Sequence, residues 1–466
     1  MTSPPRQRRT ALLAVGAVGL LIAVLGIVFA FIPDDRPGVV EPAWLNDPLD
    51  GKVRYCTGED LSRSQEASVR DFNERFGQEN GAVLVELSAT ANGQFAEYKR
   101  ILRADAESQC DIVYLDVIHM PYFATKNLLY DMTPYLQQNN RIGEFDDTLV
   151  KTIRYEDKFW GVPKQLDAGV LFYRTDKGLR PPRSWPDLFE QARPRNQGEK
   201  PRLRFQAAGY EGLTVVFLEL AYSAGARPII SSDGKRADIY QEPAVRALAA
   251  MRNAIGRALP KEAINQADKG SLSIFEHGGA LFMRSWPFAA ARIHRDADIA
   301  ERNRKRDAVV RRQAADNFKV VPLPPWTPGG DHVGILGGHD LVIPRNARNP
   351  RGALRLIDFL TSFSQVRQDA REYAQVPVLK SVASDPDVKN ETIPAIRRTR
   401  IEERPLIANY DVVSQIISSG LSEALQKKKQ IRTALIDINR CVQEALQSSE
   451  AGIDEGLDAK ACLDGQ

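Results

Sequence analysis

Residues that could carry out covalent chemistry are sparse in this chain of 466 residues. The chain has no HExxH metalloprotease motif, no GxSxG nucleophile elbow, no P-loop and no dinucleotide-binding GxGxxG pattern. Many Asp and Glu residues could form acid–base pairs, but no spacing singles out two of them. The sequence therefore predicts neither an enzyme nor a cofactor or metal site. Only five histidines are present, and they are scattered along the chain: His119, His277, His294, His332 and His339.

Length and composition predict a folded chain with more than one core. Single cores stop growing at roughly 250–300 residues, so two lobes are expected. The chain is 43% hydrophobic and 26% charged, which is typical of globular proteins. Its 63 Lys and Arg residues nearly balance 60 Asp and Glu residues, for a net charge of +3. Nucleic-acid binding needs a strongly basic surface, so no nucleic-acid partner is expected.

The elements that must position any site begin after residue 51. Short apolar runs predict strands at 53–55, 83–87 and 112–115, and amphipathic stretches predict helices at 64–76 and 93–106. This alternation predicts a parallel α/β sheet covered by helices. Ligands of such sheets bind at the carboxyl ends of the strands. Three loops are therefore the first candidates for a site: residues 57–60, 90–94 and 116–119.

The rest of the chain continues the α/β pattern. Segment 295–312 is dense in Arg and Asp, which predicts a solvated helix or loop, with an anionic partner such as lipid headgroups as the alternative. Further strands are expected at 171–173, 319–323 and 341–343, and further helices at 185–192, 213–224, 242–259, 349–362 and 421–445.

The first residues predict a transmembrane helix. Three arginines precede an uncharged run at 11–32, which spans about 33 Å as a helix and matches a bilayer core of roughly 30 Å. Basic residues stay on the cytoplasmic side, so the following chain is expected outside the cytoplasm. A cleaved signal sequence is the main alternative, although the run is long and no clear cleavage site follows it. The predicted segments are a short cytoplasmic piece at 1–10, the anchor at 11–32 and a proline-rich tether at 33–50.

Four cysteines are candidates for disulfide bonds, because the chain is expected outside the cytoplasm, where disulfides persist. Their number is even, and none forms a CxxC motif. Order along the chain favours two local bridges, but other pairings and free buried thiols stay open. The favoured pairs are Cys56 with Cys110 and Cys441 with Cys462.

Several sequence blocks follow one another in a fixed order between about residues 53 and 445. They include CTGEDLSRSQ, CDIVYLDVIHMPYFA, FWGVPKQLDAGVLFYRTD, GYEGLTVVFLELAYSAGA, IFEHGGALFMRSWPFAAA, GILGGHDLVIPRNARNPRGALRLIDFLTS and ERPLIANYDVVS. In this order the chain resembles the extracellular solute-binding proteins of bacterial ABC transporters, family 1, of the maltose/trehalose-binding type. The resemblance implies a type II periplasmic-binding-protein-like fold: two α/β lobes joined by a multi-strand hinge, with the solute between them.

The resemblance also implies where the chain crosses between the lobes. The crossings are expected near 166–168, 334–338 and 399–403, and several crossing strands make a soft hinge that allows closure. The implied segments are 51–165 and 337–399 for lobe one, 168–335 and 402–447 for lobe two, and 448–466 for a C-terminal tail.

The positions that match the family motifs offer the two ingredients of a sugar clamp, planar hydrogen-bonding groups and aromatic faces. His119 stands where many relatives would have an aromatic residue, and His339 also departs from the usual apolar or aromatic residue. The resemblance implies eleven solute-binding residues: Asp60, Asp116, His119, Asp167, Tyr210, Glu211, Trp286, Phe288, Gly337, Gly338 and Arg404.

Each of these residues also has a purely structural interpretation. Asp60 and Asp116 could cap the helices that follow their strands. Trp286 could belong to the core, since tryptophan is often largely buried. Gly337 and Gly338 could serve only a tight turn.

Together these features predict extracytoplasmic binding of a small solute, a mono- or oligosaccharide, by closure of the lobes. The solute would pass to the permease subunits of an ABC-type importer. The protein is expected in the cell membrane, single-pass, with its binding domain outside the cytoplasm. The alternative is a membrane-anchored solute sensor that signals through a partner membrane protein.

Overall fold

A computed structural model describes residues 51–77, 81–87, 93–103, 109–138, 140–450 and 458–465. The chain divides into two compact units, residues 1–41 and 42–466, and the fold below is that of the second unit. The predicted anchor at 11–32, the tether at 33–50 and most of the loop at 90–94 lie outside the described residues. Within the described ranges, no helix is long and apolar enough to cross a membrane.

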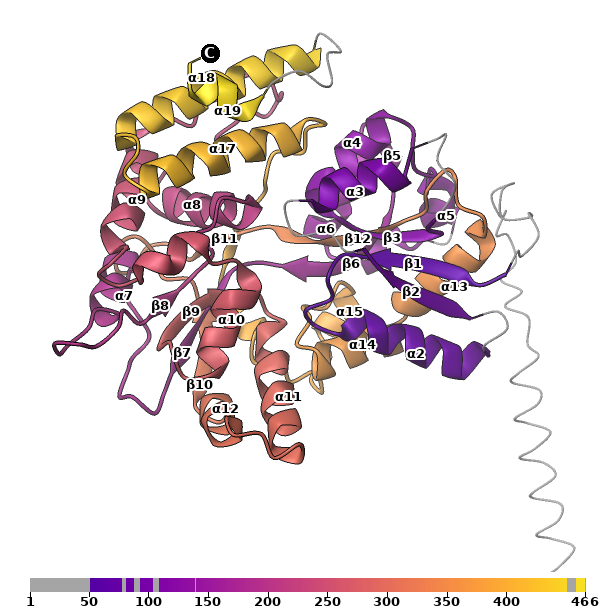
Figure 1. Cartoon of the computed structure of the whole chain (residues 1–466). Coiled ribbons are helices and arrows are strands. Elements are labelled where there is room, and N and C mark those ends of the chain that lie inside the picture. Colours follow the sequence, from indigo (N-terminus) through magenta and orange to yellow (C-terminus); the bar gives the residue numbers. More distant parts are fainter. Residues whose placement is uncertain are drawn as a thin grey trace, which may run out of the picture. The chain divides into compact units, whose positions relative to one another are not determined.

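The first sheet has five strands in the order β2-β1-β3-β12-β6. The first three strands are parallel, and β12 runs antiparallel to both β3 and β6. Crossover helices connect the parallel strands, which confirms the predicted βαβ opening. Figure 1 shows α2, α13 and α14 on one face of this sheet and α3 and α4 on the other. The strands are β1 (Val53–Thr57), β2 (Ala82–Glu86), β3 (Ile112–Asp116), β6 (Val162–Asp167) and β12 (Gly337–Val342).

The second sheet has four strands in the order β10-β7-β9-β8. Strand β7 pairs antiparallel with β10 and β9, and β8 runs parallel to β9. Every residue of β7 is buried, because helices cover both faces of the sheet. The strands are β7 (Val170–Arg174), β8 (Leu203–Arg204), β9 (Phe282–Ser285) and β10 (Phe318–Pro322).

The helices bury their apolar faces in two large hydrophobic clusters. The apolar helix α8 is buried over nearly its whole length, as its continuous run LTVVFLELAY requires. The helices are α2 (Ser64–Phe76), α3 (Gln94–Ile101), α4 (Met120–Thr125), α5 (Thr133–Gln138), α6 (Asp147–Thr152), α7 (Trp185–Gln191), α8 (Glu211–Ser223), α9 (Glu242–Ala254), α10 (Asp268–Glu276), α11 (Ala289–Arg302), α12 (Ala308–Ala315), α13 (Pro350–Leu360), α14 (Phe363–Glu372), α15 (Lys380–Ala383), α16 (Ile393–Arg397), α17 (Tyr410–Leu425), α18 (Ile431–Glu450) and α19 (Ala459–Leu463). Short 3₁₀ turns and two-stranded pairs complete the fold: η2 (Val117–His119), η3 (Ile142–Glu144), η4 (Lys261–Asn265), β4 (Arg154–Tyr155), β5 (Lys158–Phe159), β11 (Val333–Ile335) and β13 (Arg400–Glu402).

Short connections join strands of the first sheet to neighbouring strands. Strand β6 of the first sheet ends at Asp167, and β7 of the second begins at Val170. Strand β12 follows β11 after a single residue, and β11 pairs in parallel with β13. These segments include the regions near 166–168, 334–338 and 399–403, which the family resemblance implies as crossings.

A buried ion pair fixes β6 against the helices of the first sheet. The Lys164 ammonium lies 2.5 Å from Asp369 on α14 and donates to the Leu360 carbonyl at 3.1 Å. Gln365 and Ser68 donate to the other Asp369 oxygen. Both charged side chains are at most 2% exposed, so they need this full set of partners. The strand that carries Asp167 is therefore held firmly in place.

Both predicted disulfide bonds are present. Cys56 on β1 joins Cys110 just before β3, and Cys441 on α18 joins Cys462 on α19. In the chain-entropy model each bridge stabilises the fold by roughly 2–4 kcal/mol.

Three of the predicted helices are longer than the observed ones. The helix expected at 93–106 ends at Ile101, and the helix expected at 242–259 ends at Ala254. The helix expected at 421–445 is wrong, because α17 ends at Leu425 and α18 begins at Ile431. Lys427 between them adopts the left-handed conformation, with φ of 62°, within a run of three lysines that repel one another. The chain reverses there, and α18 packs against α17.

The basic segment folds as the sequence predicts. It forms the end of α11, a turn and α12, and its charges are largely solvated. Arg312 pairs with Asp298 and with Glu301, so much of the segment's charge is balanced within itself.

Candidate functional site

A cavity of about 760 Å³ lies between the two sheets, and all eleven predicted solute-binding residues line it. Its floor is one face of three adjacent strands of the first sheet. Tyr114 and Asp116 on β3, His339 on β12, and Gln165 and Asp167 on β6 stand on this face, because side chains two residues apart point the same way. The strand pairing aligns them: His339 lies opposite both Asp116 and Gln165.

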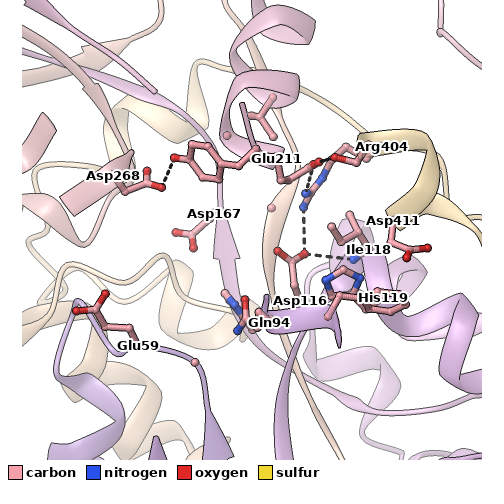
Figure 2. Close-up of a pocket in the computed structure, with 18 of the residues that line it drawn as sticks. Glu59, Gln94, Asp116, Ile118, His119, Asp167, Glu211, Asp268, Arg404 and Asp411 are labelled. Atoms are coloured by element: carbon pink, nitrogen blue, oxygen red, sulfur yellow. Dashed lines mark hydrogen bonds and ion pairs between the residues drawn. The ribbon is translucent and has the colours of Figure 1, made fainter. Parts of the chain in front are cut away.

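Arg404 joins the two sides of the cavity. Its guanidinium lies 3.2 Å from Asp116 at the end of β3 and 2.8 Å from Glu211, the first residue of α8. Its Nε donates to the Leu336 carbonyl at 3.1 Å. Figure 2 shows these side chains converging from separate elements. The sequence predicts Arg404 as a donor to solute hydroxyls, but the structure commits this group to two carboxylates and a carbonyl.

The charges in this triad support one another. Arg404 is 5% exposed, and burial alone would lower its pKa, but the carboxylates of Asp116 and Glu211 raise it above its ordinary value. Burial would raise the pKa of Asp116, yet the Arg404 guanidinium holds it below its usual range. Tyr410 donates to Glu211 at 2.9 Å, and Ser414 donates to its other oxygen. Burial raises the pKa of Glu211, although Arg404 and Ser414 oppose this shift.

The two aspartates that follow β1 and end β3 make different contacts. Asp60 accepts from the backbone N–H of Ser62 at 3.1 Å and of Gln65 at 2.8 Å, so it caps the start of α2. Asp116 accepts from the Ile118 N–H at 3.2 Å and also binds Arg404. Helix capping thus explains the contacts of both Asp60 oxygens. It explains only one of the contacts of Asp116, because Asp116 also pairs with Arg404.

Two neutral histidines in the cavity lining stack on aromatic side chains. His119 stacks on Phe95 with ring centroids 4.5 Å apart, and His339 stacks on Tyr114 at 4.0 Å. Burial lowers the pKa of His119 to about 4 and lowers that of His339 as well. The buried Nδ1 of His339 has no hydrogen-bond partner among the described residues. Both rings can therefore exchange hydrogen bonds with a polar solute without adding charge.

Trp286 is positioned by a network on the other side of the cavity. Its indole N–H donates to Asp268 at 2.9 Å, and Tyr210 donates to the second oxygen of the same carboxylate at 2.6 Å. The Arg284 guanidinium lies 4.0 Å from the Trp286 ring centroid and is paired at 2.5 Å with fully buried Glu219. Trp286 is only partly buried and lines the cavity. The indole is held by its edge and by a cation, as an aromatic platform for a ligand requires.

Asp167 carries an oxygen that is ready to accept a hydrogen bond. Tyr114 donates to Gln165, and Gln165 donates to one Asp167 oxygen at 2.7 Å. The other oxygen, Oδ1, has no partner in the part of the chain that the structure describes, although the residue is only 8% exposed. Burial raises the pKa of Asp167 to about 7. Such an unsatisfied buried group is costly unless a ligand or water pairs with it.

Gly338 lets the backbone of β12 approach that of β6. Its φ is +131°, and an added Cβ would lie 2.0 Å from the Gln165 carbonyl oxygen. This supports the structural interpretation of Gly338, while Gly337 lies opposite Asp167 in the strand pairing. Phe288 lines the cavity at the start of α11.

Several lining residues were not predicted from the sequence. Tyr114 and Gln165 stand two residues before Asp116 and Asp167, so strand alternation could have identified them. Asp268, which orients both Trp286 and Tyr210, had no such signal. Across the described ranges, no group of three or more His, Cys, Asp and Glu side chains is arranged to hold a metal ion.

Comparison with known proteins decides the family. The family described as bacterial extracellular solute-binding protein matches residues 60–365, which is more than half of the chain. The chain belongs to this family. The solute-binding protein is similar to a probable ABC transporter-binding protein of Deinococcus radiodurans, with 27% identity over 437 residues, covering 87% of this chain and 94% of the relative.

Solved structures agree with this assignment. Maltose-bound MalE3 of T. maritima shares 26% identity at a TM-score of 0.72, covering 84% of this chain and 99% of that one. The GacH receptor of Streptomyces glaucescens shares the fold at a TM-score of 0.70 and 20% identity, covering 86% and 99%. The fold is that of type II periplasmic sugar-binding proteins, with the binding domain outside the cytoplasm. Because this family binds solutes for ABC transporters, the prediction that the chain is not an enzyme is confirmed.

Removing the Arg404 side chain should destabilise the solute-binding protein even without solute. Arg404→Ala leaves Asp116 and Glu211 facing each other without their cation, and we expect the free energy of unfolding to fall by about 3 kcal/mol. Arg404→Lys should recover only part of this loss, because an ammonium lacks the planar fork. Urea unfolding without sugar measures it, with Arg400→Ala as the control for an exposed, surface-paired arginine. Equal stability of Arg404→Ala and wild type would contradict the bridging role.

The raised pKa of Asp167 predicts a pH-dependent stability difference. The folded state keeps a proton between the ordinary pKa of 3.8 and the folded value of about 7, while the unfolded chain has released it. The protonated form of Asp167 therefore contributes fully to the free energy of unfolding below about pH 4, and this contribution is lost as the pH rises to about 7. The free energy of unfolding should be measured for wild type and Asp167→Asn at pH 5 and pH 8. Relative to wild type, the variant should be more stable at pH 8 than at pH 5. A difference between the two proteins that does not change with pH would contradict this pKa.

Proposed function

We propose that this solute-binding protein captures a small oligosaccharide in the cavity between its sheets and delivers it to the permease subunits of an ABC-type importer. One observation carries the proposal: Asp167 and His339, each with a buried polar atom that has no partner among the described residues, line the same cavity as the positioned indole of Trp286. Carboxylate and imidazole groups suit sugar hydroxyls, and an indole suits the C–H face of a sugar ring. MalE3 of T. maritima is known with maltose, and GacH of S. glaucescens with acarbose, which supports a carbohydrate ligand.

The binding chemistry follows from the hydrogen bonds already used. Asp167 Oδ1 would accept a sugar hydroxyl that completes the Tyr114–Gln165–Asp167 chain. Each carboxylate side chain of the Arg404 triad is about a quarter exposed, at 24% for Asp116 and 23% for Glu211, and keeps lone pairs for further hydroxyls. A neutral solute would gain these bonds without disturbing the charge balance of the triad.

We further propose that the two lobes, 51–165 with 337–399 and 168–335 with 402–447, close around the solute by bending at the three crossings. Contacts between these segments support the proposal. Glu59 pairs with Lys269, Lys99 lies 3.9 Å from Asp411, and Arg292 donates to the Leu61 carbonyl at 3.3 Å. A solute that touches both sides would add to these contacts and shift the protein toward this arrangement. The comparisons lend no support to the sensor alternative.

Loss of the aromatic platform should weaken sugar binding. Trp286→Ala removes the indole that faces the ring of the solute, and a large aromatic anchor commonly contributes at least about 2 kcal/mol, or roughly thirtyfold in affinity. Calorimetry with maltose, trehalose and longer glucose oligomers provides the measurement. Trp326→Ala is the matched control, because Trp326 is also a partly buried tryptophan but does not line the cavity. Unchanged affinity in Trp286→Ala, or an equal loss in both variants, would refute the proposed site.

We propose that the uncharged run at 11–32 anchors the protein in the membrane. The full-length chain should then stay with the membrane pellet after carbonate extraction, and a variant that lacks residues 1–36 should not. A mature N-terminus near residue 33, found by N-terminal sequencing, would replace the anchor with a cleaved signal sequence.

A further inference from the structure

The C-terminal segment, which the sequence predicts as a tail, forms part of the cavity wall. Asp458, Ala459 and Lys460 at the start of α19 line the same cavity as Asp167 and Trp286. Beside them, α17 contributes Ser414, Gln415, Ser418 and Ser419. These seven residues are called the α17–α19 wall below. Figure 1 shows α17, α18 and α19 together at the end of the chain.

Helix α19 depends on its surroundings for its position. A helix of five residues has no stability of its own in water. The Cys441–Cys462 disulfide ties it to α18, and Arg440 and Lys429 donate to the carbonyls of Cys462 and Leu463 at 2.8 and 2.7 Å. The disulfide is the only covalent link among these ties besides the chain itself, so the position of α19 depends on it.

The α17–α19 wall presents groups that suit a sugar. Ser414 and Ser418 stand one helical turn apart, as do Gln415 and Ser419, so their side chains share one side of α17. Ser414 donates to Glu211, and Ser418 donates to the Gln415 carbonyl at 3.3 Å, which leaves both hydroxyl oxygens able to accept. Lys460 and Asp458 add a donor and an acceptor on the α19 side. A hydroxyl-rich unit of a ligand would find partners on both helices.

The size of the cavity leaves room for more than one sugar unit. A volume of about 760 Å³ corresponds to roughly 25 water molecules at ~30 Å³ each, the space of roughly two or three hexose units. The positioned indole of Trp286 and the free oxygen of Asp167 serve one unit. A second unit then has the remaining lining available, and α17 and α19 supply much of it.

We propose that the α17–α19 wall is a second subsite that receives the far sugar unit of an oligosaccharide, and that the Cys441–Cys462 disulfide holds this subsite in place. The inference rests on the proposed sugar-binding function and adds the length of the preferred ligand to it. The subsite makes the solute-binding protein selective for longer oligosaccharides. Loss of the disulfide removes this selectivity and leaves the first unit bound.

Two variants of the full chain test the subsite. The double variant Cys441→Ser with Cys462→Ser releases α19, and Ala459→Trp fills the wall from a partly exposed position. Calorimetry compares glucose, maltose and maltotriose. Both variants should bind maltose and maltotriose at least about tenfold more weakly than wild type and bind glucose with nearly unchanged affinity, because glucose has no second unit. Cys56→Ser with Cys110→Ser is the matched control, because that bridge lies in the first sheet away from the wall, and it should leave the preference for longer sugars intact.

The outcomes separate the two claims. An equal loss for all three sugars, or no loss for maltotriose in Ala459→Trp, overturns the subsite while the proposed function stands. If wild type binds none of the three sugars, the proposal of a glucose oligomer as ligand fails, and the subsite fails with it. Unfolding curves of each variant without sugar show whether a general loss of binding reflects a loss of fold.

Discussion

The ion-pair triad of Arg404 is the interaction on which the cavity depends. One guanidinium binds the end of β3 in the first sheet and the start of α8 beside the second sheet. Arg404 lies two residues after the end of β13, the strand at the third expected crossing. The same residue therefore links this strand to both sides of the cavity. Breaking a buried pair on one side leaves a charge without a partner, so the three residues hold one another in place. The arrangement of the lining residues follows from this constraint.

The rest of the cavity is arranged around neutral hydrogen-bonding groups. Burial keeps His119 and His339 uncharged, and it raises the pKa of Asp167 to about 7. These three side chains therefore add little charge next to the triad. On the opposite side, Asp268 orients both Trp286 and Tyr210. A neutral, hydroxyl-rich ligand suits this combination, because it can satisfy the free acceptors without bringing a charge into a buried site.

Sequence reasoning succeeded where the signal is local. Alternating apolar runs and amphipathic stretches predicted the parallel opening of the first sheet, and the order of cysteines predicted both disulfides. Sequence reasoning failed where one backbone conformation interrupts a helix. Left-handed Lys427 lies between α17 and α18, where the sequence predicted one continuous helix. The roles of Arg404 and Asp268 could not be predicted, because their partners are 18 to 288 residues away along the chain. The family resemblance placed all eleven residues at one cavity but could not show which of their atoms are already bonded.

The central claim is that a sugar binds in the cavity between Asp167 and Trp286, beside the Arg404 triad. A crystal structure of the protein with a bound glucose oligomer tests it most directly. The account predicts a sugar ring against the Trp286 indole, a hydroxyl within hydrogen-bond distance of Asp167 Oδ1, and Arg404 still paired with Asp116 and Glu211. A sugar bound outside this cavity, or an Arg404 that leaves both carboxylates to bind the sugar, would contradict it.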